Sequence, residues 1–289
     1  MSILNCGQRQ LHYQLFTHHT ATAPLVIYLH GLLMDNLSSG YFTFTHHLKD
    51  HAHVLLYDLV GHGRSSFVSS GYRLKDHYHD LDQLLSTAQA EIKSQLIKEG
   101  VLRDDQPLTL PVILVGCSFG GTLALYTSTK LNQVHSVVLL EGHTGTPQFL
   151  TQLTDDLSST GERAENLVAQ HFQHWLHRSS ERKRTRLLKR SERLIYGSSL
   201  LQDLREDATQ SMEAPSLDMP ILYMYGSNSD AMMQAQSLYR SRQNKGGLND
   251  LFKSYEGQTH ALLWEKTSDV TDSLIKWIKG EHLGLYSSV

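Results

Sequence analysis

The chain alternates between short, fully apolar runs and longer segments in which apolar residues recur every three or four positions. The apolar runs span residues 25–29, 54–57, 112–115, 137–140 and 221–225. Runs of this length are typical of strands covered on both faces of a sheet. Two shorter strands are expected in the first sixteen residues, around a turn at Cys6-Gly7-Gln8, and a last one at 251–255.

Helical spacing of apolar residues occupies the stretches between these runs. It predicts helices near 38–49, 74–99 and 119–131, and a last helix over 261–279. Strands that alternate with helices indicate an α/β fold, with a mostly parallel sheet and helices on both of its faces.

One segment interrupts this alternation. Residues 143–218 contain no good candidate for a buried strand, and they predict several helices with a turn near 196–199. Because the segment falls between two strands, we expect it to stand over one end of the sheet as a helical cap. Residues 1–142 and 219–289 are then expected to form the core.

Composition narrows the class of protein. The 289 residues are 40% hydrophobic and 19% charged, with a net charge of −3, which excludes disordered, collagen-like and coiled-coil chains. The two cysteines, Cys6 and Cys117, cannot build a disulfide scaffold, which is typical of a reducing compartment. No apolar stretch reaches the roughly 18 residues of a membrane span, and the start does not look like a secretory leader. We therefore expect a cytoplasmic protein.

The strongest chemical signal is Gly116-Cys117-Ser118-Phe119-Gly120-Gly121, which lies between the strand 112–115 and the next helix. A G-x-S-x-G sequence in this context places the serine on a tight strand-to-helix turn with its hydroxyl exposed. Ser118 is therefore the predicted nucleophile. The backbone N–H of Phe119, at the helix N-terminus, can face a developing oxyanion.

A nucleophilic serine needs a base, and the base needs an acid that orients it. His260 follows the last strand and precedes the last helix, which places it at the same edge of the sheet. Asp230 follows the strand 221–225, and the chain order Ser, Asp, His is the one found in this architecture. These residues predict a Ser118-His260-Asp230 triad.

With two further motifs, the sequence resembles the α/β-hydrolase superfamily over nearly its whole length. His30-Gly31-Leu32-Leu33-Met34-Asp35 resembles the oxyanion loop of that family, and the resemblance implies that Leu32 donates its backbone N–H. The segment from Asp58 to Ser65 resembles the family's D-x-x-G-x-G-x-S turn, and the segment 143–218 has the position of its variable helical cap.

One position departs from the family pattern. The family's acid commonly lies three residues after the glycine that ends the strand, which is Ser229 in this chain, and Asp230 comes one residue later. Glu141, at the end of the strand 137–140, is the alternative acid, since some members resembling this chain take the acid from there.

The expected function is a serine hydrolase that cleaves a carboxylic ester or thioester through an acyl-enzyme, without a metal or an organic cofactor. Three alternatives stay open. They are an acyl-thioesterase acting on acyl carrier protein or coenzyme A substrates, a C–C hydrolase or lyase with the same triad, and a ligand-binding relative with little activity.

A basic segment of the predicted cap suggests a binding site for an acidic partner or an anionic part of the substrate. Residues 178–193 hold eight Lys or Arg and two acidic residues. A solvated helix face explains this pattern, but it also fits docking of an acidic acyl carrier protein or of coenzyme A phosphates. The segment carries no interleaved aromatics, so we do not expect it to bind nucleic acid.

Overall fold

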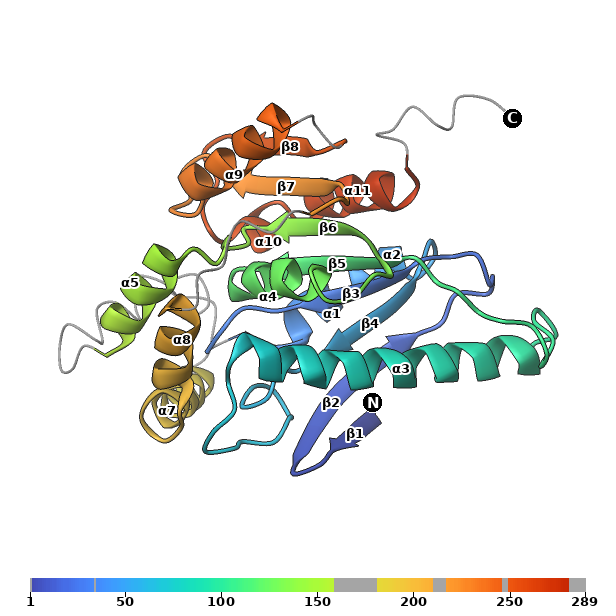
Figure 1. The fold of residues 1–289 in the computed structure, drawn as a ribbon, viewed down its shortest axis with the longest axis horizontal. Coiled ribbons are helices and arrows are strands. Elements are labelled where there is room, and N and C mark those ends of the chain that lie inside the picture. Colours follow the sequence, from blue (N-terminus) through green and yellow to red (C-terminus); the bar gives the residue numbers. More distant parts are fainter. Residues whose placement is uncertain (1, 34, 159–180, 210–216, 246–248, 281–289) are drawn as a thin grey trace.

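An eight-stranded sheet forms the centre of the protein (Figure 1). The computed structural model describes residues 2–33, 35–158, 181–209, 217–245 and 249–280. The strands lie in the order β1-β2-β4-β3-β5-β6-β7-β8; β1 and β2 run antiparallel to their neighbours, and the other pairs are parallel. Their bounds are β1 Ser2–Cys6, β2 Arg9–Phe16, β3 Leu25–Leu29, β4 His53–Tyr57, β5 Val112–Cys117, β6 Val134–Leu140, β7 Ile221–Gly226 and β8 Leu251–Tyr255. The predicted α/β fold with a mostly parallel sheet is confirmed.

Helices cover both faces of this sheet. The helices outside the β6–β7 connection are α1 Ser38–Thr43, α2 Thr45–Leu48, α3 Leu74–Lys98, α4 Phe119–Ser128, α9 Met232–Asn244, α10 Leu262–Glu265 and α11 Thr267–Ile278. In β3, Ile27 faces a core shared with α3 and α4, while its neighbour Tyr28 faces a second core with α2 and α11. Residues that alternate between two buried faces explain why these strands consist of continuous apolar runs. No described helix has the length and apolar character that a membrane crossing requires.

The helix predictions need two corrections and one addition. The stretch 38–49 forms two short helices that meet at Phe44, and the stretch 261–279 forms α10 and α11, separated at Lys266. Lys266 has a non-helical backbone (φ −132°, ψ 42°), although the apolar spacing continues across it. Helix α9 was not predicted, because it buries a single residue, Ala235, and shows little apolar periodicity.

Three helices described between β6 and β7 lie beyond one end of the sheet (Figure 1). They are α5 Pro147–Leu157, α7 Glu181–Tyr196 and α8 Leu200–Thr209, called the inserted helices below. Helix α8 packs against both α5 and α7. The described part of 143–218 holds helices and no strand, as predicted, and Gly197–Ser199 separates α7 from α8. Residues 159–180 and 210–216 of the predicted cap lie outside the described residues.

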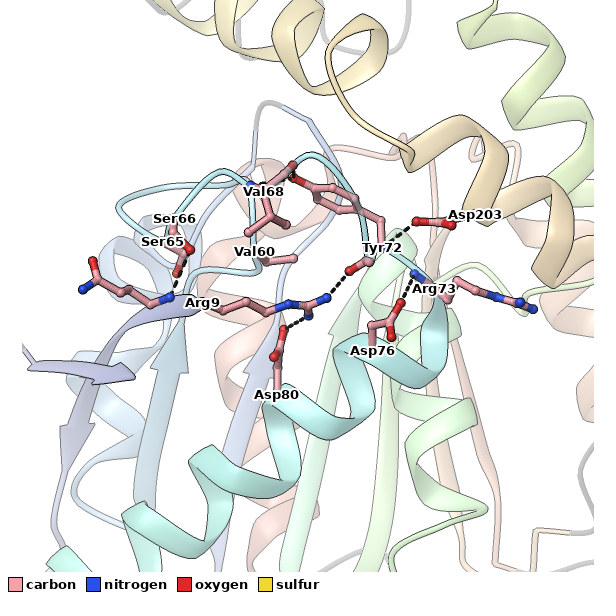
Figure 2. Close-up of polar contacts among 12 residues, drawn as sticks. Arg9, Val60, Ser65, Ser66, Val68, Tyr72, Arg73, Asp76, Asp80 and Asp203 are labelled. Carbon is pink, nitrogen blue, oxygen red and sulfur yellow. Dashed lines mark hydrogen bonds and ion pairs between the residues drawn. The ribbon is translucent and has the colours of Figure 1, made fainter. Parts of the chain in front are cut away.

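Helix α8 is tied to the start of α3. Asp203 accepts a hydrogen bond from the backbone N–H of Tyr72 at 2.8 Å (Figure 2), and Asp207 accepts one from the N–H of Leu74, also at 2.8 Å. The Arg73 side chain donates to Asp207 at 3.0 Å. Acidic side chains of one helix therefore satisfy free N–H groups at the N-terminus of another.

Arg9 on β2 also contacts the chain that leads into α3. Its guanidinium donates to Asp80 of α3 and to the carbonyl of Gly71, each at 2.6 Å (Figure 2). Arg9 thus fixes the chain that enters α3, and with it the attachment point of the inserted helices.

Candidate active site

Ser118 occupies a strained turn between β5 and α4. Its backbone has φ 53° and ψ −123°, a conformation that L-residues rarely adopt. The turn requires close backbone approach, because a Cβ on Gly120 would lie 1.9 Å from the carbonyl oxygen of Leu29. This turn places the half-buried Ser118 side chain at the carboxyl edge of the sheet and at the N-terminus of α4.

The loop after β3 lies directly against Ser118. A Cβ on Gly31 would be 3.1 Å from the Cβ of Ser118, so glycine allows the loop to come this close. In the described part of the chain, the backbone N–H groups of Leu32 and Phe119 donate to no acceptor. Two unused amides beside a serine hydroxyl are the donors that an oxyanion hole requires.

Two buried histidines support this loop. The Nδ1–H of His30 donates to the carbonyl of Gly31 at 2.6 Å, and its Nε2 accepts from the N–H of Leu59 at 2.9 Å. The Nε2 of His62 accepts from the N–H of Leu33 at 2.8 Å, and its Nδ1–H donates to a carbonyl of its own turn. Burial and the neighbouring His30 ring lower the pKa of His62 well below its usual range. Both rings therefore hold the backbone of the oxyanion loop in place.

Asp58 performs the same task for the neighbouring turn. Its carboxylate accepts from the N–H of Leu37 at 2.9 Å, from the N–H of Arg64 at 2.7 Å and from the ring of His12 at 2.9 Å. The D-x-x-G-x-G-x-S segment is thus a structural support for the loop that carries Leu32.

His260 lies on the loop after β8, next to two carboxylates. Its Nδ1 is 3.5 Å from Oε2 of Glu141 and 3.7 Å from Oδ1 of Asp230. The loop is fixed to the end of β7, where the N–H of Asn228 donates to the carbonyl of Gln258 at 2.9 Å. The structure therefore places both acids that the sequence suggested within reach of the same ring nitrogen.

The two carboxylates differ in their surroundings. The side chain of Glu141 is 1% exposed and that of Asp230 is 61% exposed. Glu141 accepts hydrogen bonds from the N–H of Gly226 at 2.5 Å and from the hydroxyl of Ser229. Ser229 is the position at which the family pattern expects the acid, and here it serves as a donor to Glu141. Glu141 is therefore a fixed, buried charge, while Asp230 faces solvent.

These charges act on the titration of His260. Burial lowers the pKa of His260, but the nearby Glu141 carboxylate, followed by the charges of Asp230 and Asp35, outweighs it and raises the pKa above its usual value. An imidazole whose protonated form is favoured by a buried carboxylate is suited to accept a proton during catalysis.

His143 connects the nucleophile to the histidine loop, and sequence reasoning gave it no role. Its N–H donates to the carbonyl of Ser118 at 2.8 Å, and its ring stacks on His260 with centroids 5.2 Å apart. The hydroxyl of Thr122 on α4 donates to the carbonyl of His143 at 3.1 Å. Sequence reasoning also treated Ser229 as a missing acid rather than as a donor. Neither role has a sequence signal, because both depend on which side chains meet at the sheet edge.

Within the described residues, no group of three or more His, Cys, Asp or Glu side chains is placed to hold a metal ion. The elements at this edge offer instead a hydroxyl, an imidazole, a buried carboxylate and two amides.

A family model described as the alpha/beta hydrolase family matches residues 26–270 of the chain. Among curated proteins, no relative matches the chain. Solved structures with the same fold include an enol-lactonase from Burkholderia xenovorans LB400, 17% identical, which covers 96% of this chain and 100% of its own with a TM-score of 0.65. An esterase from Exiguobacterium antarcticum is 14% identical and covers 94% and 96%, with a TM-score of 0.62. A bromoperoxidase from Bacillus anthracis is 16% identical and covers 96% and 99%, with a TM-score of 0.60.

Proposed function

Because this chain belongs to the α/β hydrolase family, we propose that it is a serine hydrolase that cleaves carboxylic esters or thioesters through an acyl-enzyme. The observation that carries the proposal is the strained Ser118 turn, which shares the sheet edge with two unused amides and with a histidine backed by a buried carboxylate. Similar folds bear names as different as enol-lactonase and bromoperoxidase, so the argument rests on the site and not on the fold.

The mechanism follows from the positions of these groups. His260 takes the proton of Ser118 as the hydroxyl attacks the carbonyl carbon of the substrate. The N–H groups of Leu32 and Phe119 stabilise the negative charge that forms on the carbonyl oxygen. The proton then passes from His260 to the leaving alcohol or thiol, and water activated by His260 releases the acyl group.

We assign the third position of the triad to Glu141 rather than to Asp230. The assignment is supported by the burial of Glu141, by its two hydrogen-bond donors and by its larger effect on the pKa of His260. A buried carboxylate held by other groups keeps the imidazole in one tautomer and orientation. The exposed carboxylate of Asp230 is free to rotate into solvent and adds a weaker, screened charge.

We also propose that the segment 143–218 is a cap over the active site, with 1–142 and 219–289 as the core. The position of the inserted helices beyond one end of the sheet supports this division, as does the tie between α8 and the start of α3. A cap in this position would shape the pocket for the acyl or leaving group.

A labelling experiment tests the proposal. A fluorophosphonate probe is expected to add one label to the wild type and to Ser227→Ala, a control serine at the same sheet edge, and none to Ser118→Ala. Turnover is then measured with p-nitrophenyl butyrate and with S-butyryl-N-acetylcysteamine, a simple thioester. Labelling that persists in Ser118→Ala, or folded wild-type protein that neither labels nor turns over either substrate, would contradict the proposal.

A further inference from the structure

Four arginines in the described part of the chain have partly buried side chains, and three of them are paired with carboxylates. Those three are Arg9, Arg73 and Arg242, whose nearest carboxylate oxygens lie 2.6, 2.8 and 2.7 Å away. Arg190 on α7 is the fourth, and no carboxylate of the described residues lies within ion-pair distance of it. Among the described residues Arg190 thus has no carboxylate to offset its partial burial, and burial of an uncompensated charge is costly.

The contacts of Arg190 place it next to the active-site loops. Its Nε–H donates to the carbonyl of Gly61, at the long distance of 3.4 Å. A Cβ on Gly61 would lie 2.7 Å from Leu194, so this face of α7 rests directly on the turn. The next residue, His62, holds the N–H of Leu33 in the oxyanion loop. Arg190 is therefore separated from the proposed oxyanion hole by a single turn of the chain.

The carboxylate whose charge acts on Arg190 is already used. Asp58 accepts from two backbone N–H groups and from the ring of His12, and it makes no ion pair with Arg190. Burial lowers the pKa of Arg190, the charge of Asp58 opposes this change, and Arg186 and Arg193 add to the lowering. Among the described residues, more positive than negative charges therefore act on the guanidinium.

Exposed cations surround Arg190 on the same helix. Arg186 and Arg193 lie four residues before and three residues after it, which puts them on the same side of α7. The guanidinium of Arg193 covers the ring of Phe67 at 4.0 Å from its centroid, and none of the three makes an ion pair with a described carboxylate. They form a positive surface that leads to the partly buried Arg190.

We propose that Arg190, flanked by Arg186 and Arg193, binds an anionic group, a carboxylate or a phosphate, on the substrate that Ser118 attacks. The inference rests on the proposed function and adds the chemical class of the substrate to it. A guanidinium binds such oxyanions through two parallel N–H donors, which fixes orientation as well as charge. A lysine at this position would supply the positive charge but not the paired donors of arginine.

Two matched substrate pairs test this on the intact protein. Butyryl-coenzyme A and S-butyryl-N-acetylcysteamine share the acyl group and the thioester, and differ in the phosphates of the leaving group. Monomethyl and dimethyl glutarate differ in a carboxylate on the acyl side. We expect kcat/KM of the wild type to be about tenfold or more higher for the anionic member of at least one pair, with a gap that narrows as salt rises. The pair that shows the gap identifies the anion.

Substitutions on α7 test whether Arg190 causes the difference in kcat/KM between anionic and neutral substrates. Arg190→Gln is expected to abolish the gap by raising KM for the anionic member, with less than about a threefold change for the neutral one. Arg190→Lys is expected to keep part of the gap, because the charge remains and the paired donors are lost. Arg182→Gln, which removes an exposed cation two turns away on α7, is the matched control and is expected to keep the full gap.

The outcomes separate the inference from the function on which it rests. Hydrolysis of the neutral members by the wild type establishes the activity by itself. Equal kcat/KM for both members of both pairs at low salt would overturn the anion site, as would equal losses for both members in Arg190→Gln. A salt-sensitive preference found only with a butyryl thioester on an acyl carrier protein would overturn the small-molecule assignment and transfer the recognition to a protein surface.

Discussion

At the scale of single residues, we expect replacement of each of the two carboxylates beside His260 to affect catalysis differently. Glu141→Gln keeps the shape of the side chain and removes the charge that orients the imidazole, so we expect kcat to fall by about 10²- to 10⁴-fold. Asp230→Asn removes an exposed charge, and we expect kcat to stay within about threefold of the wild type. Hydrolysis of p-nitrophenyl butyrate measures both. A large loss confined to Asp230→Asn would transfer the third position of the triad to that residue.

The pH dependence of the reaction follows from the same contacts. His260 must be neutral to take the proton from Ser118, so kcat/KM rises with pH through the pKa of His260. Since Glu141 raises that pKa, Glu141→Gln is expected to move the acidic limb of the profile to lower pH. Asp230→Asn is expected to move it in the same direction by less. Profiles from about pH 5 to about pH 9 test this, and an acidic limb that stays in place in Glu141→Gln would argue against the contact.

The sequence predicts Ser118 as the nucleophile and His260 as the base, and it places Asp230 ahead of Glu141 as the acid, whereas the geometry favours Glu141. The position of Ser118 follows from a local pattern, because glycines on either side are what a strained strand-to-helix turn requires. The role of Glu141 depends on tertiary geometry. Its backbone has a positive φ of 52°, and the hydroxyl of Ser229 arrives from a strand end 88 residues later in the chain. Neither feature has a signature in a single sequence.

At the scale of elements, the contact between α8 and α3 makes a stability prediction. In Asp207→Ala, the N–H of Leu74 and the guanidinium of Arg73 lose a buried acceptor, which is expected to cost about 1–3 kcal/mol of unfolding free energy. Glu206→Ala removes the other partner of Arg73, a side chain 45% exposed, and is expected to cost less than about 1 kcal/mol. Urea unfolding followed by circular dichroism compares the two. Equal losses would show that the backbone contact of Asp207 contributes nothing.

The limits of prediction at this scale follow from burial. Strands such as β3 were predictable because both faces are covered and every residue is apolar. Helix α9 fully buries only Ala235, and its other core-facing residues, Met232, Leu238 and Tyr239, are partly exposed, so its apolar pattern is weak. The break at Lys266 lies within an apolar pattern that suits both α10 and α11, and periodicity alone does not reveal a change in helix direction.

At the scale of the whole molecule, sheet topology assembles the site from distant parts of the chain. The ends of β3, β5, β6, β7 and β8 supply the oxyanion loop, Ser118, Glu141, Ser229 and His260. Because these strands are parallel, their carboxyl ends share one edge, which is where ligands bind in open α/β sheets. This rule allowed the site to be predicted from strand order, whereas the contribution of the inserted helices depends on packing that varies freely with sequence.

Three buried histidines, in β4, in the turn after it and in α3, have pKa values lowered by burial in the folded protein. Burial, with the charges of Arg9 and His30, lowers the pKa of His77 to about 3. Burial and the charge of His18 lower that of His53 to about 4, and burial places that of His62 well below its usual value. In the unfolded chain these groups bind protons near pH 6.5. Between that pH and the lower pKa values of the folded state, the unfolded chain therefore binds up to three more protons than the folded protein.

These pKa changes fix the direction in which the unfolding free energy depends on pH. Stability is fully present above about pH 6.5 and is lost as the pH falls towards the folded pKa values, by up to about 1.4 kcal/mol per pH unit for each histidine. We expect the unfolding free energy to fall by up to about 4 kcal/mol per pH unit between about pH 6 and pH 5. His260 acts in the opposite direction, because its pKa is raised in the folded protein and its contribution to stability is lost as the pH rises. His77→Phe keeps an aromatic ring against Phe119 and is expected to reduce the slope by about a third. Urea unfolding at several pH values measures it, and an unchanged slope in the variant would mean that His77 is protonated in the folded protein.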